Sequence, residues 1–428
     1  MNNTNGSQGI KVKDRNEGLL KDSIIMFAAT SGVNLLNFIF HMYVSRKLGP
    51  EEYGVLVPLL GLVILFSMPA LALQMTIVKK TSICMARKNY GGIEHLFRKT
   101  TGWFLMLGAV YFIGFLAGGP FIQSFFKIDD YGLIVILGLI AVVSLIIPVV
   151  RGILQGMQNF IGMGLNLTLD AVLRLGSLIL FLMLGFGVRG ALLTTFVGAF
   201  CAYLVGIFML SFLFKHREKN VEILRKRDIL SYALPVFFSA TAFSLLSYMD
   251  VFMVKHFFAE HDAGLYSATS IIGKAFLFFP GAIVMTLFPK VSQSFELNNA
   301  TGKMLLKSLG LTAVVSAAAI IFCYFFPDFV IGLLFGGEYK GIAPVVRIFG
   351  AAILPLVLIN VVMNYCLAIH RYVMIYIMYA GIILYAVLLW FFHASFMQVI
   401  TILFSVNLAI LLLSLLTAKE NRKPEHAV

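Results

Sequence analysis

The segment HMYVSRKLGPEEYGVLVPL (residues 41–59) recurs in pattern as VFMVKHFFAEHDAGLYSAT (251–269), about 210 residues further along the chain. In both segments an apolar stretch ends in one or two basic residues, and an acidic turn follows. Gly54 or Gly264 then opens the next apolar stretch. Identity between the two segments is low, and two helical hairpins also look alike by chance. The correspondence nevertheless favours a chain built from two halves of the same design.

The composition places both halves in a membrane. Of the 428 residues, 60% are hydrophobic and 12% are charged, with a mean hydropathy of +0.93, whereas an ordinary soluble domain is about 25% charged. This excludes a soluble enzyme, a disordered chain and a disulfide scaffold. A membrane β-barrel would alternate apolar and polar residues, but here the apolar runs reach about 20 residues, enough for a transmembrane helix. The sequence predicts an all-α polytopic membrane protein.

Hydropathy predicts about twelve transmembrane helices, six in each half. They begin near Ile24, Tyr53, Thr101, Gly132, Leu165, Gly190, Ile229, Gly264, Met304, Ile342, Tyr372 and Phe396. An even number per half makes the halves a parallel repeat, related by an axis along the membrane normal. We expect an N-tail (1–21), a six-helix lobe (22–214), a basic linker (215–228), a second six-helix lobe (229–416) and a C-tail (417–428). Two such lobes are typical of alternating-access transporters.

The net charge of +13 arises from 33 Lys and Arg against 20 Asp and Glu. Of the basic residues, 24 fall in loops and tails on the side of the two termini and 7 on the opposite side. Because cytoplasmic loops collect Lys and Arg, we expect a multi-pass protein of the cytoplasmic membrane with both termini in the cytoplasm. The positive charge then needs no nucleic acid to explain it. Two basic residues, Arg174 and Lys274, fall inside predicted helices.

Arg174 lies four residues after Asp170 on the fifth predicted helix, so the two side chains share a face. A charge at mid-membrane costs about 2.5–3.5 kcal/mol on insertion scales, and it therefore faces a cavity or a partner in most membrane proteins. Two interpretations stay open. The residues form a self-neutralising pair that braces the bundle, or they line a polar cavity in which the arginine binds an anion.

Lys274 lies about ten residues into the eighth predicted helix, with no acidic residue within a turn on either side. Ser267 and Ser270 precede it at helical spacing. An unpartnered intramembrane lysine is the most specific indication of a ligand-binding site in this chain. The alternative is an ion pair with Asp250, near the outer end of the preceding helix. Asp250 and Asp170 are also candidates for coupling transport to a proton or a sodium ion.

The first predicted helix carries an uncharged polar stripe that ends at a basic residue. Its members recur at spacings of three and four, and they are Ser31, Asn34, Asn37, His41 and Ser45, followed by Arg46. Hydrogen bonds between helices explain many such stripes, and a water-filled groove is the other interpretation. For His41, a hydrogen-bonded histidine and a proton sensor both stay open.

Three passages carry a family resemblance. They are SGVNLLNFIFHMYVSRKLGPEEYGVL (31–56), RGILQGMQNFIGMGLNLTLDAVLRLG (151–176) and SYMDVFMVKHFFAEHDAGLYSATSIIGKAF (247–276). The most characteristic patterns are a basic residue before Leu-Gly-Pro-x-x-Tyr-Gly at 47–54 and Arg-Gly-x-Leu-Gln-Gly-x-x-x-Phe at 151–160. From about residue 20 to 416, the chain resembles Wzx-type polysaccharide-biosynthesis flippases, which belong to the multidrug/oligosaccharidyl-lipid/polysaccharide exporter (MOP) superfamily.

The resemblance implies a two-lobed carrier that moves a polyprenyl-diphosphate-linked oligosaccharide repeat unit across the cytoplasmic membrane for cell-surface polysaccharide synthesis. Its partners would be this substrate, membrane lipids and other polysaccharide-assembly proteins. A diphosphate needs basic groups and a sugar needs hydrogen-bonding groups. The candidate substrate ligands are therefore Lys274, Arg174, Asn34, Asn37, His41 and Arg46. No cofactor is expected, and the four cysteines lack the CxxC or CxxH spacing of a metal site.

Two other functions compete with the flippase. A cation-coupled multidrug antiporter of the same superfamily would need acidic residues to dominate its cavity, whereas here two intramembrane bases balance two acids. A membrane glycosyltransferase or polymerase would need a catalytic carboxylate, commonly on a large extramembrane loop. The longest external connection, PDFVIGLLFGGEYKG (327–341), is short and holds few candidates.

Overall fold

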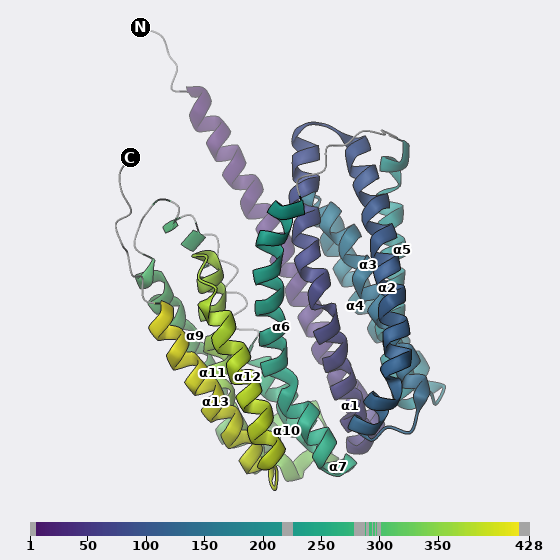
Figure 1. The fold of residues 1–428 in the computed structure, drawn as a ribbon, viewed down its shortest axis with the longest axis vertical. Coiled ribbons are helices and arrows are strands. Elements are labelled where there is room, and N and C mark those ends of the chain that lie inside the picture. The colour runs from purple at the N-terminus through teal and green to yellow at the C-terminus, as the bar shows by residue number, and fades with distance from the viewer. Residues whose placement is uncertain are drawn as a thin grey trace. The chain divides into compact units, whose positions relative to one another are not determined.

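The computed structural model describes residues 6–215, 226–277 and 301–418, with six further positions between 287 and 297. All regular elements of these residues are helical (Figure 1). The helices are α1 (Gly6–Ala86), α2 (Tyr90–Phe126), α3 (Tyr131–Gly156), α4 (Phe160–Met183), α5 (Gly187–Met209), η1 (Ser211–Lys215), α6 (Lys226–Phe257), α7 (Glu260–Ala275), α9 (Gly302–Phe325), α10 (Pro327–Leu334), η2 (Gly337–Ile342), α11 (Ala343–Ala368), α12 (Val373–Phe391) and α13 (Phe396–Ala418). Residues 1–5, 216–225 and 419–428 of the predicted tails and linker lie outside the described residues.

The helices match the predicted spans. Ten helical segments of the described residues are long and apolar enough to cross a membrane. One of them, Ile24–Ala86, has 63 residues, whereas a single span needs about 20. It holds two predicted spans, and Gly49, with a φ of 72°, interrupts its helical backbone between them. The eighth predicted span begins in α7. Together, these helical segments confirm the predicted all-α, multi-pass class.

The helices pack into two compact units, each assembled from separate stretches of chain. Unit 1 comprises Met1–Val44, Pro69–Pro120 and Asp130–Ala233, and unit 2 comprises Ser45–Met68, Phe121–Asp129 and Leu234–Val428. The chain therefore passes from one unit to the other within α1, α2 and α6. The lobe boundaries expected from the sequence, 22–214 and 229–416, stay a prediction.

In unit 1, α3 is the central helix. It is an almost unbroken run of Ile, Leu and Val, and most of its side chains are buried. It packs against α4 and α5, which also pack against each other (Figure 1). Its residues Val149 and Ile153 share a hydrophobic core with Ile93 and Phe97 of α2. This core helps to position α3 and α4, the helices that carry Arg151, Asp170 and Arg174.

The Arg-Gly-x-Leu-Gln-Gly pattern at 151–156 forms a close crossing between α3 and α1. A Cβ atom at Gly156 would lie 2.7 Å from the backbone oxygen of Val78, so only glycine fits there. Ser82 donates a hydrogen bond to the Gly156 carbonyl at 3.1 Å, and the amides of Gln74 and Gln155 lie 3.2 Å apart. Small residues that let two backbones approach, with polar side chains beside them, are typical of helix contacts in membranes.

In unit 2, α11 packs against α7, α9 and α13, and α12 packs against α13 (Figure 1). The second half of α1 joins this unit through the two glycines that mark the internal repeat. A Cβ atom at Gly54 would lie 2.6 Å from the Gly264 nitrogen, and one at Gly264 would lie 1.7 Å from the Pro50 oxygen. The repeated glycines are therefore in direct contact, where α1 and α7 cross backbone to backbone.

The N-terminus of α3 is held by Asp130. Its Oδ1 accepts a hydrogen bond from the Gly132 nitrogen at 2.8 Å, which caps the helix. The same carboxylate pairs with Arg189, whose Nη2 lies 2.7 Å from Asp130 Oδ1. The hydrogen bond from Arg189 holds the pKa of Asp130 below its ordinary value. Asp130 thus ties the start of α3 to the start of α5 within unit 1.

Replacing Asp130 with Asn should lower stability only where the carboxylate is charged. Asn also caps helices, so the change removes the charge and keeps the cap. Because the pKa is lower in the folded protein, the pair stabilises above the ordinary aspartate pKa of about 3.9, and this contribution disappears as the pH falls through the folded value. We expect only a small loss of stability at pH 7, since Arg189 is exposed and the pair is screened by solvent. The unfolding midpoints of the variant and the wild type are compared in detergent at pH 7 and at pH 3. An equal difference at the two pH values would contradict this prediction.

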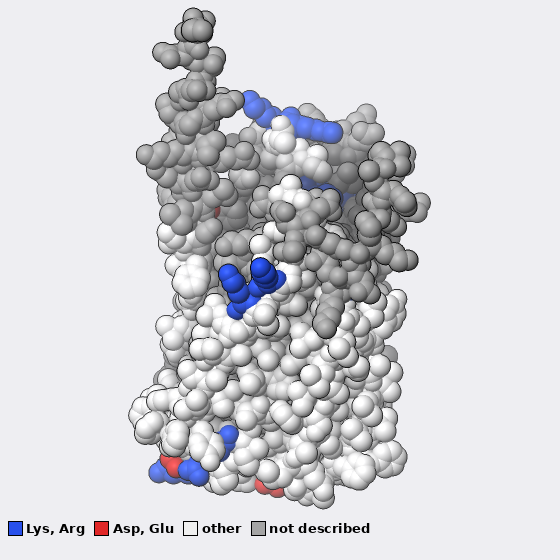
Figure 2. Space-filling view, turned by 90° about the vertical axis from the view of Figure 1, so that its left-hand side faces the viewer, with Lys and Arg blue, Asp and Glu red and all other residues white. Residues whose placement is uncertain are grey.

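One face of the molecule carries few charged side chains (Figure 2). Lys and Arg stand on it in small separate groups, and most of the remaining described surface is uncharged. Large apolar side chains such as Met183, Phe208 and Tyr376 are more than three-quarters exposed. In water such a surface would aggregate, whereas in a bilayer it contacts lipid. The surface therefore agrees with the multi-pass class.

Candidate functional site

In unit 1, Asp170 does not pair with Arg174. It pairs with Arg151 of α3, whose Nη2 lies 2.7 Å from Asp170 Oδ2. Arg151 also donates from Nε to Asn166 Oδ1 at 3.0 Å, and Asn166 donates to the Ala202 carbonyl of α5 at 2.6 Å. Of the two interpretations left open for Asp170 and Arg174, the self-neutralising pair is not observed, because the carboxylate pairs with an arginine of α3.

Arg174 instead reaches α1. Its Nη1 lies 3.4 Å from Asn37 Oδ1, and its guanidinium carbon lies 4.6 Å from the centre of the Phe40 ring. A cation over an aromatic face is stabilised by the ring quadrupole without using up the guanidinium hydrogen-bond donors. Gly198 of α5 makes this arrangement compact, because a Cβ atom there would lie 3.2 Å from Arg174 Cβ and 2.7 Å from Asp170 Oδ1. The Arg151–Asp170 pair thus leaves the charge of Arg174 uncompensated by that carboxylate.

The polar residues of the first span lie in different environments. Asn34 is exposed and Asn37 is half-buried beside Arg174. His41 is half-buried and its ring lies edge-on to Phe40, with centroids 5.5 Å apart. Of these residues, the structure brings Asn37 together with Arg174. A substrate-binding role for Asn34 and His41 stays a prediction.

Arg46 lies in unit 2 and contacts the short outer helix α10. Its Nη2 donates to the carbonyls of Gly332 at 3.1 Å and Leu333 at 2.6 Å. These carbonyls belong to the last turn of α10, where a basic side chain satisfies free acceptors and complements the helix dipole. Nearby, Tyr339 of η2 donates to the Ser45 carbonyl at 3.2 Å. These contacts give Arg46 a structural role, and its role as a substrate ligand stays a prediction.

Lys274 of α7 has an unusual environment in unit 2. Its Nζ atom is buried and has no hydrogen-bond partner among the described residues. It lies 4.0 Å from the centre of the Tyr248 ring, which α6 presents. A buried ammonium with unused donors is costly in a membrane. The Lys274 ammonium can therefore donate hydrogen bonds to an acceptor that a ligand supplies.

Asp250 is the acidic residue that the sequence offered as an alternative partner of Lys274, but the two residues form no direct ion pair. Its side chain is 1% exposed, and its Oδ2 accepts hydrogen bonds from Tyr266 at 3.2 Å and Ser270 at 3.3 Å. Its Oδ1 has no donor among the described residues. Asp250 is thus held by hydroxyl groups of α7, and the predicted alternative of a direct Lys274–Asp250 pair is not observed.

Three residues of these clusters were missed by sequence reasoning. Arg151 was assigned to a cytoplasmic loop, although α3 continues to Gly156. Tyr248 and Tyr266 have no distinctive spacing among the 16 tyrosines. The glycines of the Arg-Gly-x-Leu-Gln-Gly pattern could have indicated that the helix extends past Arg151, because a helix contact needs a continuing helix.

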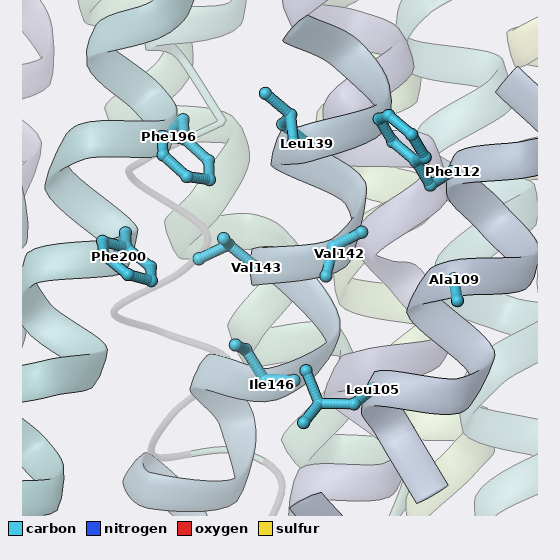
Figure 3. A pocket seen from close by; sticks show the side chains of 9 residues that line it. All are labelled: Leu105, Ala109, Phe112, Leu139, Val142, Val143, Ile146, Phe196 and Phe200. Carbon is cyan, nitrogen blue, oxygen red and sulfur yellow. The ribbon is translucent and has the colours of Figure 1, made fainter. Parts of the chain in front are cut away.

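The described residues of unit 1 enclose an apolar cavity. No group of three or more His, Cys, Asp and Glu side chains in the described ranges could hold a metal ion. A cavity of about 350 Å³ opens between α2, α3 and α5 of unit 1, and residues such as Leu105, Val142 and Phe200 line it (Figure 3). All nine of its lining residues are apolar. It therefore suits a hydrocarbon chain and not a charged headgroup.

Sequence comparison assigns the family. The polysaccharide biosynthesis protein family matches residues 19–295, which is more than half of the chain. An uncharacterized membrane protein of Methanocaldococcus jannaschii is 25% identical over 338 residues, covering 72% of this chain and 75% of the relative. The family match spans all of the passages that carried the resemblance at residues 31–56, 151–176 and 247–276.

Structural comparison assigns the fold. An inward-facing multidrug resistance MATE family transporter of the MOP superfamily superposes with a TM-score of 0.76 at 15% identity, covering 92% of this chain and 97% of the other. An outward-facing structure of such a transporter gives a TM-score of 0.67 at 17% identity, with 94% of each chain covered. The predicted fold of two six-helix lobes is confirmed by this match. The chain belongs to the polysaccharide biosynthesis protein family, and it is a multi-pass membrane protein with the fold of MATE family transporters.

Proposed function

We propose that this transporter is a flippase for a polyprenyl-diphosphate-linked oligosaccharide repeat unit, working by alternating access. Membership of the polysaccharide biosynthesis family supports a substrate from that chemistry. Such a substrate is a lipid whose headgroup combines a diphosphate with sugars, so a carrier must offer both cations and hydrogen-bonding groups inside the membrane.

One observation carries the proposal. The Lys274 ammonium is buried in α7, where the sequence predicts the eighth span, with no hydrogen-bond acceptor among the described residues. A Lys ammonium has three donors, and a diphosphate oxygen is a strong, charged acceptor for them. A cationic drug would be repelled by the same group. The environment of Lys274 therefore favours an anionic substrate.

Unit 1 supplies a second candidate cation, Arg174. Arg174 is held over Phe40 and beside Asn37, while Asp170 is occupied by Arg151. Arginine binds phosphate oxygens through two parallel hydrogen bonds. Arg174, with the amide of Asn37 beside it, is therefore a second proposed ligand for an anionic group of the substrate.

The proposal includes a cellular setting. The protein would lie in the cytoplasmic membrane with both termini in the cytoplasm, as the excess of Lys and Arg on that side favours. It would take its substrate from the inner leaflet and work beside other polysaccharide-assembly proteins. Asp250, with one carboxylate oxygen unsatisfied in the described part of unit 2, is the leading candidate for ion coupling, and Asp170 is the second.

Replacing Lys274 with Ala tests the proposal. We expect flipping of a fluorescent prenyl-diphosphate-linked oligosaccharide in proteoliposomes to slow about tenfold or more, because charge-assisted hydrogen bonds contribute about 1.5–3 kcal/mol each. Surface glycan should fall in a cell that depends on the protein. Lys340→Ala, which removes an equal charge from the exposed helix η2, is the matched control. Undiminished glycan at normal expression of Lys274→Ala would overturn the assignment.

A cation-coupled multidrug antiporter is the second candidate, and the buried, partly unsatisfied carboxylate of Asp250 favours it. Such a carrier would expel a cationic dye, and Asp250→Asn would stop the expulsion. Dye efflux that depends on Asp250, together with no flipping of the diphosphate lipid, would establish the antiporter. Flipping without dye efflux would establish the flippase.

A further inference from the structure

The ammonium of Lys274 is held in place by a ring and not by a hydrogen bond. Its Nζ lies 4.0 Å from the centre of the Tyr248 ring, and no described residue accepts a hydrogen bond from it. The nearest buried acid, Asp250, is engaged with the hydroxyls of Tyr266 and Ser270. The aromatic face attracts the positive charge, but it leaves the three N–H groups available.

The position of the Tyr248 ring depends in turn on a glycine. Gly61, in the second half of α1, faces Tyr248 and Phe252 of α6. A Cβ atom at Gly61 would lie 2.7 Å from Tyr248 Cδ1 and 2.9 Å from Phe252 Cε1, closer than such atoms pack in proteins. The two rings are stacked, with centroids 6.2 Å apart and an angle of 23° between their planes. Any side chain at position 61 would push this stack away from α1.

We propose that Tyr248 and Gly61 are positioning residues, which hold the Lys274 ammonium charged and with its donors unused for a phosphate group of the substrate. The inference rests on the proposed function, since it assumes that Lys274 meets a diphosphate. It adds that the recognition of this anion is built from three helices of unit 2. Gly61 of α1 makes room for the ring, Tyr248 of α6 provides it, and Lys274 of α7 lies on it.

This arrangement suits a carrier, which must release its cargo. A lysine paired directly with a carboxylate would have to break that pair before binding phosphate. A lysine on a ring exchanges no hydrogen bond when an anion arrives, and it returns to the same contact when the anion leaves. The ring also keeps the long lysine side chain from turning toward Asp250, where it would be neutralised.

The test measures binding of farnesyl diphosphate, a short prenyl diphosphate, to the full-length protein in detergent, with farnesol as the uncharged reference. Tyr248→Phe keeps the ring face and should bind within about twofold of the wild type. Tyr248→Leu and Gly61→Ala should each weaken binding about tenfold, as expected for a desolvated cation–ring contact. Farnesol binding should not change in any variant. Tyr379→Leu, which makes the same change at a half-buried tyrosine of α12, is the control and should bind like the wild type.

A double-mutant cycle separates positioning from general packing. In a Lys274→Met background, Tyr248→Leu should cause no further loss, because the ring acts through the lysine. An equal loss with and without Lys274 would overturn the inference, and so would full affinity in Tyr248→Leu. Tyr248→Leu keeps the test decisive if Gly61→Ala fails to fold. Wild-type protein that binds farnesyl diphosphate no better than farnesol would instead refute the proposed function itself.

Discussion

Replacing Asp170 with Leu is expected to destabilise the protein by about 3 kcal/mol, near the lower end of the range for breaking a buried ion pair. The value is at the lower end because the side chains of Arg151 and Asp170 are 15% and 24% exposed. The change removes the carboxylate that pairs with Arg151 in unit 1. Of these contacts, Arg151 then keeps its hydrogen bond to Asn166. Denaturant unfolding in detergent, followed by helical circular dichroism, measures the effect.

The second variant distinguishes which arginine is the partner. Arg151→Met combined with Asp170→Leu should recover most of the loss, because replacing both members of a buried pair by apolar residues of similar size is often close to neutral. Arg174→Met combined with Asp170→Leu should not recover it. Recovery in the second double variant and not in the first would show that the carboxylate serves Arg174, as the four-residue spacing alone suggests.

Gly264→Ala should be the most damaging small substitution in unit 2. Its new methyl group would lie 1.7 Å from the Pro50 oxygen, and the obstacle is backbone that cannot rotate away. Overpacking costs about 1–3 kcal/mol where side chains can adjust, so we expect about 3 kcal/mol or more here. The crossing of α1 and α7 would have to open, which also displaces the helix that carries Lys274.

Gly310→Ala is the matched control for this prediction. Gly310 lies inside α9 and is exposed, and a Cβ atom added there would have no other atom within 4 Å. Alanine favours a helix by about 1 kcal/mol over glycine, so this variant should be neutral or slightly stabilised. Detergent unfolding midpoints compare the two directly. A wild-type midpoint for Gly264→Ala would mean that α1 and α7 do not cross backbone to backbone.

Much of the fold could be predicted because hydropathy acts along the chain. Each predicted span corresponds to a helical segment, and the repeat drawn from 41–59 and 251–269 led to two glycines that the structure brings into contact. The short outer helix α10 was missed, since eight residues are too few for a hydropathy window. The path of α1 through both units was also missed, because the kink at Gly49 changes direction without changing composition.

The candidate site was predictable only in part. An intramembrane charge is visible in a sequence because a charged residue type stands out within an apolar run, so Lys274, Arg174, Asp170 and Asp250 could all be named. Their partners could not, since spacing on one helix says nothing about the helix opposite. Asp170 shows this, because spacing offered Arg174 four residues away as one possible partner, whereas the carboxylate pairs with Arg151 of α3.

The sequence by itself determined the class of protein, the number of spans and the presence of charged residues inside them, because each depends on how residues partition between water and lipid. Only the tertiary structure decided what each charge meets. Arg174 lies on Phe40 and Lys274 on Tyr248 because helix packing sets how each helix is rotated and how close its neighbours come. Those rotations depend on contacts between residues far apart in the chain, such as the fit of Gly61 against Tyr248.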